Sequence, residues 1–349
     1  MFVYWLIFAI FAVGALGQGD PTARRRGAPV MLILAALLLA LVIGLRYQVG
    51  GDWGAYERMF SIDGYQSLDD TLFVTDPAYH LINTAVAKVG GEIWLVNLVC
   101  GLIFVWGLTR FAATLPDRWL AMLVAVPYLI VVVAMGYTRQ AVAIGLIMAG
   151  LAAIHRGASI PRFSLYVLGA ALFHKTAVVG LLLVLLKGKR NLLINLLFIL
   201  AAGFLLYDLL LEDSMDRLVE GYIEAEYGSQ GAAIRVAMAI VPATLFLLYR
   251  ERLGFHGEEA SLWRNFSIAA FGFLILLFVL PSSTVVDRLA LYILPLQLAV
   301  LSRVPGTLMS VGAGRVAIIA YSALVLGVWL NYAAHAVYWL PYSFYPFGG

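Results

Sequence analysis

The stretch WLAMLVAVPYLIVVVAM at residues 119–135 decides the fold class, because it holds seventeen residues and no charge. At about 1.5 Å per residue, a helix of this length spans most of the hydrocarbon core of a bilayer. Lipid offers no partners to open backbone groups, so such a segment must be helical. Similar runs lie on either side of it, at 2–16, 30–45, 92–110, 138–154, 191–210, 232–249, 265–281, 288–302 and 316–334. The sequence therefore predicts an all-α polytopic membrane protein with about ten transmembrane helices.

The composition of the whole chain agrees with this class. Of the 349 residues, 63% are hydrophobic and 12% are charged, and the mean hydropathy is +0.92. A soluble domain of this length carries more charge on its surface. The net charge of +3 includes no basic block, so nothing indicates a nucleic-acid partner. The single cysteine, Cys100, lies in an apolar run and excludes a disulfide framework.

Loop charges predict the orientation of the helices. The first run, 2–16, has no basic residues before it and three arginines after it, so we expect its N-terminus outside. The segment 163–186 is apolar except for its centre at 174–176. If it enters and leaves on the cytoplasmic side, fifteen Lys and Arg fall in cytoplasmic loops and eight outside. If it crosses once, the split becomes ten and twelve, so the positive-inside bias favours a re-entrant or broken hairpin over a single span.

The same pattern predicts where a site would lie. Each arm of the hairpin reaches only about 16 Å, so its tip must line a wet cavity. We expect one transmembrane domain over 1–349, with external loops 46–77 and 211–231 as lids over the site. For residues 78–90, the sequence predicts a short interfacial or half-inserted helix.

Four groups of ionisable residues fall on the outer side in this topology. Arg139 opens a helix that Thr138 is placed to cap, and Arg288 opens another. Helix N-termini carry partial positive charge, and together with arginine they form anion sites that suit a diphosphate. Ionisable residues at a membrane boundary are candidates for function. The four groups are Arg46 to Trp53 with Tyr56, Tyr137 to Gln140, His174-Lys175, and Asp287-Arg288.

Several of these residues also have simpler structural interpretations. A lone arginine at a helix end is often an interfacial anchor, and Asp52 fits a turn cap after Gly50-Gly51. Trp53 and Tyr56 fit an interfacial aromatic belt as well as sugar stacking. Asp76-Pro77 is most simply a helix start, with Asp as the cap and Pro at the first position. The other histidines are interpreted as structural, namely His80, His155, His256 and His335.

Motifs for nucleotide and metal chemistry are missing from the sequence. It contains no P-loop, no HExxH spacing, and no DxD pair in the outer loops. A metal-independent reaction without a cofactor therefore fits better.

Four short motifs resemble the EpsG family, and they occur in the expected order. They are RYQVGGDWGAYERMF (46–60), DPAYHLIN (76–83), YTRQAVAIGL (137–146) and ALFHKTAVVGLLL (171–183). This family is related to the Wzy-type polymerases of exopolysaccharide and O-antigen assembly. The resemblance covers about 2–300, and the last fifty residues add nothing to it. It implies the fold of GT-C-like Wzy and ligase membrane glycosyltransferases.

The resemblance also implies an activity. It points to a multi-pass protein of the bacterial inner membrane that polymerises undecaprenyl-diphosphate-linked repeat units at the periplasmic or external face. Donor and acceptor would both be such lipid-linked oligosaccharides, and a chain-length-regulating co-polymerase is an implied partner. By matching motif, the active residues would be Arg46, Asp52, Tyr56, Arg139 and His174.

The chemistry of this reaction assigns expected roles. Arg139 would stabilise the charge on the leaving diphosphate, and His174, then Asp52, is the expected base. The expected diphosphate-binding residues are Arg46, Arg139, Arg288 and Lys175, and the expected sugar-binding residues are Trp53, Tyr56 and Asp287. A glycan ligase that uses the same donor stays open as an alternative. So does a flippase or transporter, although transporters usually show paired broken helices in two related halves.

Overall fold

The structure is a computed structural model that describes residues 1–19, 30–185, 232–279, 283–345 and 347. The chain forms two compact units, of which unit 1 comprises Met1–His174 with Leu301–Gly349, and unit 2 comprises Lys175–Val300. The predicted helix at 191–210 and the predicted lid at 211–231 lie outside the described residues.

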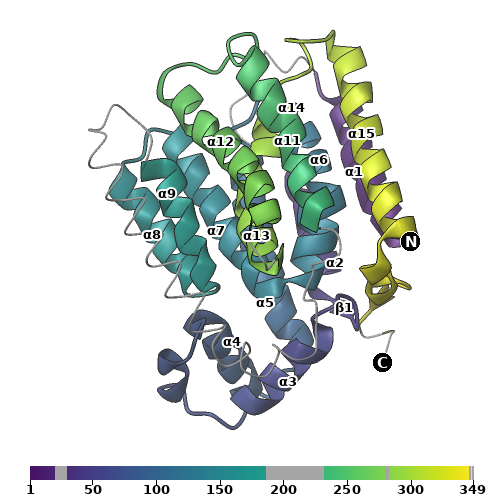
Figure 1. The fold of residues 1–349 in the computed structure, drawn as a ribbon. Coiled ribbons are helices and arrows are strands. Elements are labelled where there is room, and N and C mark those ends of the chain that lie inside the picture. The colour runs from purple at the N-terminus through teal and green to yellow at the C-terminus, as the bar shows by residue number, and fades with distance from the viewer. Residues whose placement is uncertain (20–29, 186–231, 280–282, 346, 348–349) are drawn as a thin grey trace. The chain divides into compact units, whose positions relative to one another are not determined.

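Unit 1 consists of apolar helices with a smaller part at one end of them (Figure 1). Its helices are α1 (Phe2–Gly17), α2 (Val30–Gly44), α3 (Trp53–Asp63), α4 (Pro77–Lys88), α5 (Ile93–Ala112), α6 (Arg118–Ala125), α7 (Thr138–His155), α8 (Ile160–Ala171) and α15 (Val311–Tyr332). Its shorter elements are β1 (Arg46–Tyr47), the 3-10 helices η1 (Asp70–Phe73) and η5 (Ala334–Trp339), the π-helix η2 (Val126–Ala134), and β2 (Ser343–Phe344).

Unit 2 is also helical where it is described. Its elements are η3 (Lys175–Val178), α9 (Val179–Leu185), α11 (Ala232–Tyr249), α12 (Gly257–Val279), α13 (Ser283–Ala290), η4 (Leu291–Ile293) and α14 (Pro295–Leu301). The predicted helix at 288–302 is therefore divided among α13, η4 and α14. Pro295 begins α14, as expected of a residue that has no N–H for a continuing helix.

Five of the described helices are long and apolar enough to cross a membrane, namely α5, α7, α11, α12 and α15. Three shorter apolar segments are Phe2–Gly17, Val30–Gly44 and Arg118–Ala134. These helices confirm the predicted all-α polytopic class, while the number of about ten spans stays a prediction. The predicted break at His174 is confirmed, because α8 ends at Ala171 and η3 begins at Lys175. Whether this segment is a hairpin or a single span also stays a prediction.

The close approach of α5 and α7 depends on two glycines. A Cβ at Gly107 would collide with the backbone of Gly145, and one at Gly145 would press against the Cα of Phe104. Small residues allow helix backbones to approach closely in a membrane, where van der Waals packing drives association. This contact positions α7, whose first turn carries Arg139.

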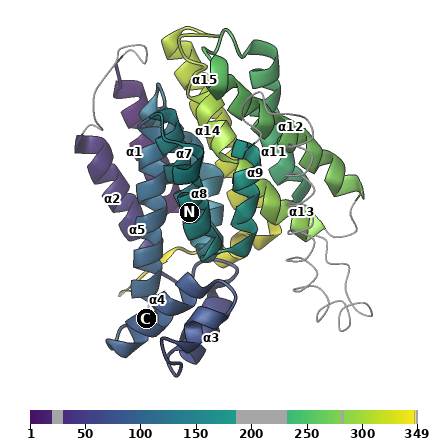
Figure 2. The ribbon, with the colours of Figure 1, turned by 90° about the vertical axis from the view of Figure 1, so that its left-hand side faces the viewer.

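The predicted external loop 46–77 is partly helical. Figures 1 and 2 show α3 and α4 at one end of α5, where the buried rings of Tyr56 and Tyr79 join Val96, Cys100 and Val142 in one apolar cluster. The helix α4 confirms the short helix predicted for 78–90. The segment that contains α3 and α4 is thus packed onto α5 and α7 by burial of its apolar side chains.

The C-terminal segment supports the turn that follows α2. β2 pairs antiparallel with β1, with Arg46 opposite Phe344. The Gly50 N–H donates to the carbonyl of Tyr338 at 2.9 Å. Gly50 has φ +111°, and a Cβ there would collide with the Met135 carbonyl, so only glycine fits.

A second contact ties this segment to the π-helix. Trp339 packs over Gly136, and its indole N–H donates to the carbonyl of Val131 at 2.7 Å. A π-helix interrupts the regular pattern of backbone bonds and frequently lies at a functional site. Here η2 ends at Ala134, and α7, which carries Arg139, begins at Thr138.

The other end of unit 1 is held by a buried ion pair. Arg315 Nε lies 2.8 Å from Asp117 Oδ2, and its two other nitrogens donate to the carbonyls of Gln18 and Gly19 at 2.5 and 2.8 Å. These contacts join the end of α1 to the beginnings of α6 and α15. The loop charges predict that these three helix ends share one side, and the structure places them together.

Candidate active site

A polar cluster of unit 1 lies where the ends of α4, α7 and α8 meet. Arg139 Nη1 lies 2.8 Å from Asp76 Oδ2, and His174 Nδ1 lies 3.7 Å from the same oxygen. The side chain of Asp76 is 3% exposed, whereas that of Arg139 is 27% exposed. A buried carboxylate thus contacts the guanidinium of an arginine whose side chain is partly exposed.

Asp76 is a site residue that the sequence analysis interpreted only as a helix cap. It does occupy the position before Pro77, but its side chain makes no capping hydrogen bond. Its backbone is left-handed, with φ +60°, a conformation uncommon for residues other than glycine and enriched at functional sites. The carboxylate is thereby turned toward Arg139 and His174. The signal in the sequence that could have identified Asp76 as a site residue was its place in the 76–83 motif.

A backbone contact explains why Asp76 and His174 meet. The Ala78 N–H in the first turn of α4 donates to the carbonyl of Leu172, just after α8, at 3.0 Å. The His174 N–H closes the last turn of α8 by donating to Ala170 at 2.9 Å. The break in the apolar segment therefore lies against the start of α4.

Tyr56 packs against the same cluster from α3. The Arg139 backbone N–H donates to its hydroxyl at 3.4 Å, and the guanidinium carbon lies 5.9 Å from the ring centre. Burial raises the pKa of the Tyr56 phenol, and the nearby Asp52 carboxylate raises it further, while Arg139 acts in the opposite direction. Tyr56 is therefore a neutral hydroxyl at pH 7. Asp52 lies at the N-cap of α3, within electrostatic range of this hydroxyl.

Arg46 is enclosed by protein. It is 1% exposed, and its guanidinium donates to the carbonyls of Ile43 and Val49, to Asn97 Oδ1 and to Thr138 Oγ1. Tyr137 occupies the N-cap of α7, and the expected cap residue Thr138 accepts from Arg46 instead. This geometry favours a positioning role for Arg46 over the expected direct contact with a diphosphate, because it links the end of α2 to the start of α7.

Trp53 belongs to a row of rings that we call the aromatic row: Trp53, Tyr47, Tyr345 and Trp94. Successive ring centres are 5.9, 6.4 and 5.5 Å apart. Three of the rings are partly exposed, and the buried indole N–H of Trp53 has no hydrogen-bond partner among the described residues. Aromatic faces with a polar edge suit the apolar faces and hydroxyls of sugars.

The remaining expected site residues belong to unit 2. Asp287 is buried, and its carboxylate lies 2.5 Å from Arg235 Nε, while the neighbouring Arg288 is exposed on α13. Lys175 is the first residue of η3. The expected convergence of Arg288 and Lys175 with Arg139 stays a prediction.

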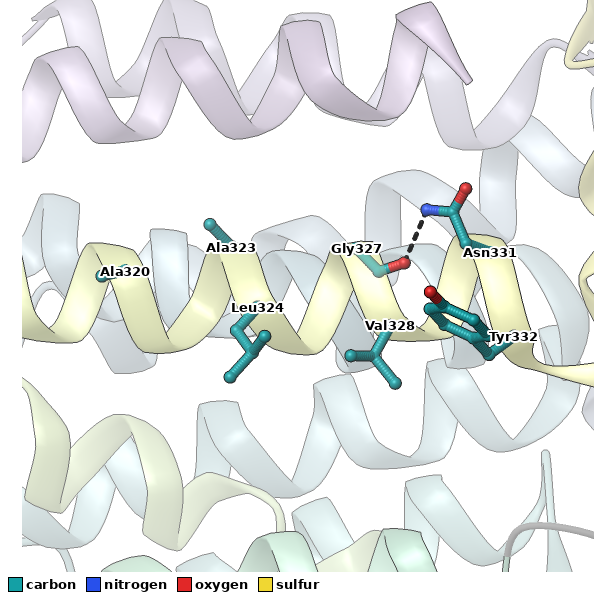
Figure 3. Close-up of a pocket in the computed structure, with 7 residues that line it drawn as sticks. All are labelled: Ala320, Ala323, Leu324, Gly327, Val328, Asn331 and Tyr332. Atoms are coloured by element: carbon teal, nitrogen blue, oxygen red, sulfur yellow. Dashed lines mark hydrogen bonds between the residues drawn. The ribbon is translucent and has the colours of Figure 1, made fainter.

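A surface hollow on unit 1 lies apart from the expected residues. Figure 3 shows it along one face of α15, where Asn331 donates to the carbonyl of Gly327 at 2.7 Å. Its lining residues are Ala320, Ala323, Leu324, Gly327, Val328, Asn331 and Tyr332. None of the expected site residues lines it. Over the described part of the chain, no three His, Cys, Asp or Glu are grouped so that they could hold a metal ion.

Together these features define a polytopic helical membrane protein with an Asp–Arg–His cluster at one end of its helices. The model of the EpsG family matches residues 30–344, and the chain belongs to this family. EpsG-type proteins are Wzy-like polysaccharide polymerases. A search of curated proteins found no match, and neither did a search of solved structures.

The matched range corrects one expectation. It extends through Ser343–Phe344, so the conclusion that the last fifty residues add nothing to the resemblance is wrong. The physical reason is that β2 pairs with β1 and completes the turn at Arg46.

Proposed function

We propose that this protein is a membrane glycosyltransferase that polymerises undecaprenyl-diphosphate-linked repeat units at the periplasmic face of the bacterial inner membrane. Its family supports a polysaccharide polymerase. The observation that carries the mechanism is the Asp76–Arg139–His174 cluster. The protein would have a GT-C-like architecture of about ten spans, and the loops 46–77 and 211–231 would cover the site as lids.

The transfer step needs stabilisation of a leaving anion. An acceptor hydroxyl oxygen bonds to the anomeric carbon of the donor, and the bond to the diphosphate oxygen breaks with its electron pair. The partly exposed side chain of Arg139 is suited to bind this diphosphate, because a guanidinium fork matches phosphate oxygens. Asp76 acts as a positioning residue that holds the guanidinium.

His174 fits the leaving-group side of the reaction. Its Nδ1 lies 3.7 Å from the carboxylate that also contacts Arg139. From there it would contact the leaving diphosphate. Asp52, near the hydroxyl of Tyr56, remains the other expected base.

The rest of the site would bind the two lipid-linked oligosaccharides. Trp53 and Tyr56 would contact sugar, and the aromatic row extends this surface. From unit 2, Arg288 and Lys175 would add charge to the diphosphate site, and Asp287 would bind sugar. These cations, and no metal, would neutralise the leaving group. A chain-length-regulating co-polymerase would act as a partner.

Reconstitution with one substrate tests the proposal. The purified protein in nanodiscs receives a lipid-diphosphate-linked repeat unit alone, and products are resolved by size. We expect a ladder of polymer and release of lipid diphosphate, and Arg139→Ala should lower the rate about 100-fold or more. Arg58→Ala changes an exposed arginine on α3 and serves as the matched control. A single transfer to a different acceptor would identify a ligase, and no transfer at all would refute the proposal.

A further inference from the structure

A second histidine–carboxylate pair joins α3 to α4. Asp63, the last residue of α3, is 1% exposed, and His80 Nδ1 lies 2.9 and 2.8 Å from its two carboxylate oxygens. Asn83 donates to the same carboxylate at 2.7 Å, and the Thr84 hydroxyl donates to the Asp63 carbonyl at 3.1 Å. From the sequence alone, His80 was expected to have only a structural role.

The position of Asp63 is unfavourable for a residue that only fastens two helices. The C-terminal end of a helix carries partial negative charge, which repels a carboxylate. Burial adds a desolvation cost, and apolar side chains of similar size often join helices as well. The carboxylate nevertheless faces the imidazole directly.

The contact with Asp63 fixes the orientation of the imidazole of His80. Nδ1 donates its hydrogen to the carboxylate, so the lone pair lies on Nε2. Of the His80 side chain, 17% is exposed, and Nε2 receives no hydrogen bond from the residues that the structure describes. A carboxylate that orients a histidine in this way supports its action as a base.

His80 also lies close to the Asp76–Arg139–His174 cluster along the chain. It follows Asp76 by one turn of α4, and the adjacent Tyr79 packs its ring 5.4 Å from that of Tyr56. Asp63 follows Tyr56, which packs against that cluster, by two turns of α3. The pair of helices α3 and α4 thus contains Asp63 and His80, and Tyr56 of α3 and the N-cap of α4 lie at the first cluster.

The elements packed against α4 bring other titratable groups, of which Tyr56, Glu57 and Arg58 lie on α3. Asp70 of η1 is held by the N–H and hydroxyl of Ser67, and Cys100 of α5 is buried beside Tyr79. Asp63 of α3 is the carboxylate that contacts the imidazole.

We propose that His80, held by Asp63, is the general base that takes the proton from the acceptor sugar hydroxyl. This assignment rests on the proposed polymerase function. The hydroxyl oxygen forms the new bond to the anomeric carbon, its proton passes to Nε2 of His80, and the diphosphate leaves with the electron pair of the broken bond. The exposed side of the ring then releases the proton to water.

This assignment separates the two histidines by role. His174 shares the Asp76 carboxylate with Arg139 at the anion site, whereas His80 has the carboxylate of Asp63. A carboxylate such as that of Asp52 is ordinarily a weaker base than an imidazole. An imidazole therefore suits proton abstraction better.

Two substitutions that preserve size test the inference in the full-length protein in nanodiscs. His80→Asn keeps a donor in the place of Nδ1 but removes Nε2, and Asp63→Asn removes the charge that supports the ring. We expect His80→Asn to lower kcat about 100- to 10,000-fold with little change in KM. His335→Asn, at an exposed histidine of η5, should leave the rate unchanged.

Chemical rescue separates catalysis from folding. Asp63→Asn should lower kcat as well, because an uncharged partner no longer supports the ring as it takes the proton. Added imidazole should restore part of the activity of His80→Ala. If the unsubstituted protein makes polymer while His80→Asn and Asp63→Asn both keep its kcat, the inference is overturned. If the unsubstituted protein makes no polymer, the proposed function itself fails.

Discussion

At the scale of single residues, Asp76 decides how the site is arranged. Its left-handed backbone directs a buried carboxylate at Arg139 and His174. Such a conformation costs about 1–3 kcal/mol for a residue other than glycine, and the contacts around Asp76 offset that cost. A strained backbone at Asp76 therefore accompanies the orientation of Arg139, which we propose to bind the diphosphate.

Asp76→Asn removes the charge and keeps the shape. We expect a loss of about 1–3 kcal/mol in the free energy of unfolding, because Arg139 loses a charged partner. Polymer formation should fall at least about tenfold, since an unheld guanidinium no longer points at the leaving group. Thermal unfolding in detergent and the product ladder measure the two effects. Glu57→Gln, at an exposed site on α3, is the control. Equal activity of both variants would contradict the positioning role.

Arg46 is expected to act differently from Arg139. Arg46→Lys leaves several buried oxygens without a donor, because one ammonium cannot reach the four acceptors that surround the guanidinium. We expect a loss of about 3–5 kcal/mol in stability. The folded fraction should keep its KM for the lipid-linked donor. A raised KM at unchanged stability would instead indicate direct contact with the diphosphate.

At the scale of elements, the packing of α5 against α7 sets the position of Arg139. The backbones approach so closely at Gly107 and Gly145 that neither tolerates a Cβ without movement. Because Arg139 lies in the first turn of α7, a shift of that helix also moves its guanidinium. The distance between α5 and α7 therefore sets the position of the guanidinium that we propose to bind the diphosphate.

Gly107→Ala tests this coupling. We expect a loss of about 1–3 kcal/mol in stability from overpacking and a lower rate of polymer formation. Gly272→Ala on α12 is the matched control, because a Cβ there meets nothing within 4 Å. By helix propensity alone, that alanine should be neutral or stabilising by up to about 1 kcal/mol. Thermal unfolding of both variants measures the difference, and similar shifts would contradict the packing argument.

At the scale of the whole molecule, orientation in the membrane stays a prediction. We expect α3 on the periplasmic side and the loop after α7 in the cytoplasm. The native Cys100 is buried, so cysteines at the exposed positions Arg58 and Arg156 provide separate probes. A membrane-impermeant thiol reagent should label Arg58→Cys in cells whose outer membrane is made permeable, and should label Arg156→Cys only after lysis. The reverse pattern would place the Asp76 cluster on the cytoplasmic side.

Periodicity and apolar length predicted most of the helices, and the polar centre at His174 predicted the break after α8. The run 288–302 was wrongly taken as one helix, since hydropathy does not show where α13 ends and α14 begins. Asp76 was missed because Asp before Pro fits a helix cap equally well. The Asp63–His80 contact joins two helices, and spacing along one helix does not reveal it.

The pairing of β2 with β1 has a consequence for biosynthesis. Ribosomes deliver this protein to the membrane from its N-terminus, yet the turn that holds Arg46 is completed by Ser343 and Phe344 at the other end of the chain. We therefore expect that a nascent chain is inactive until Phe344 has been synthesised and has left the ribosome. Transfer of glycan would begin only after both paired strands have been made.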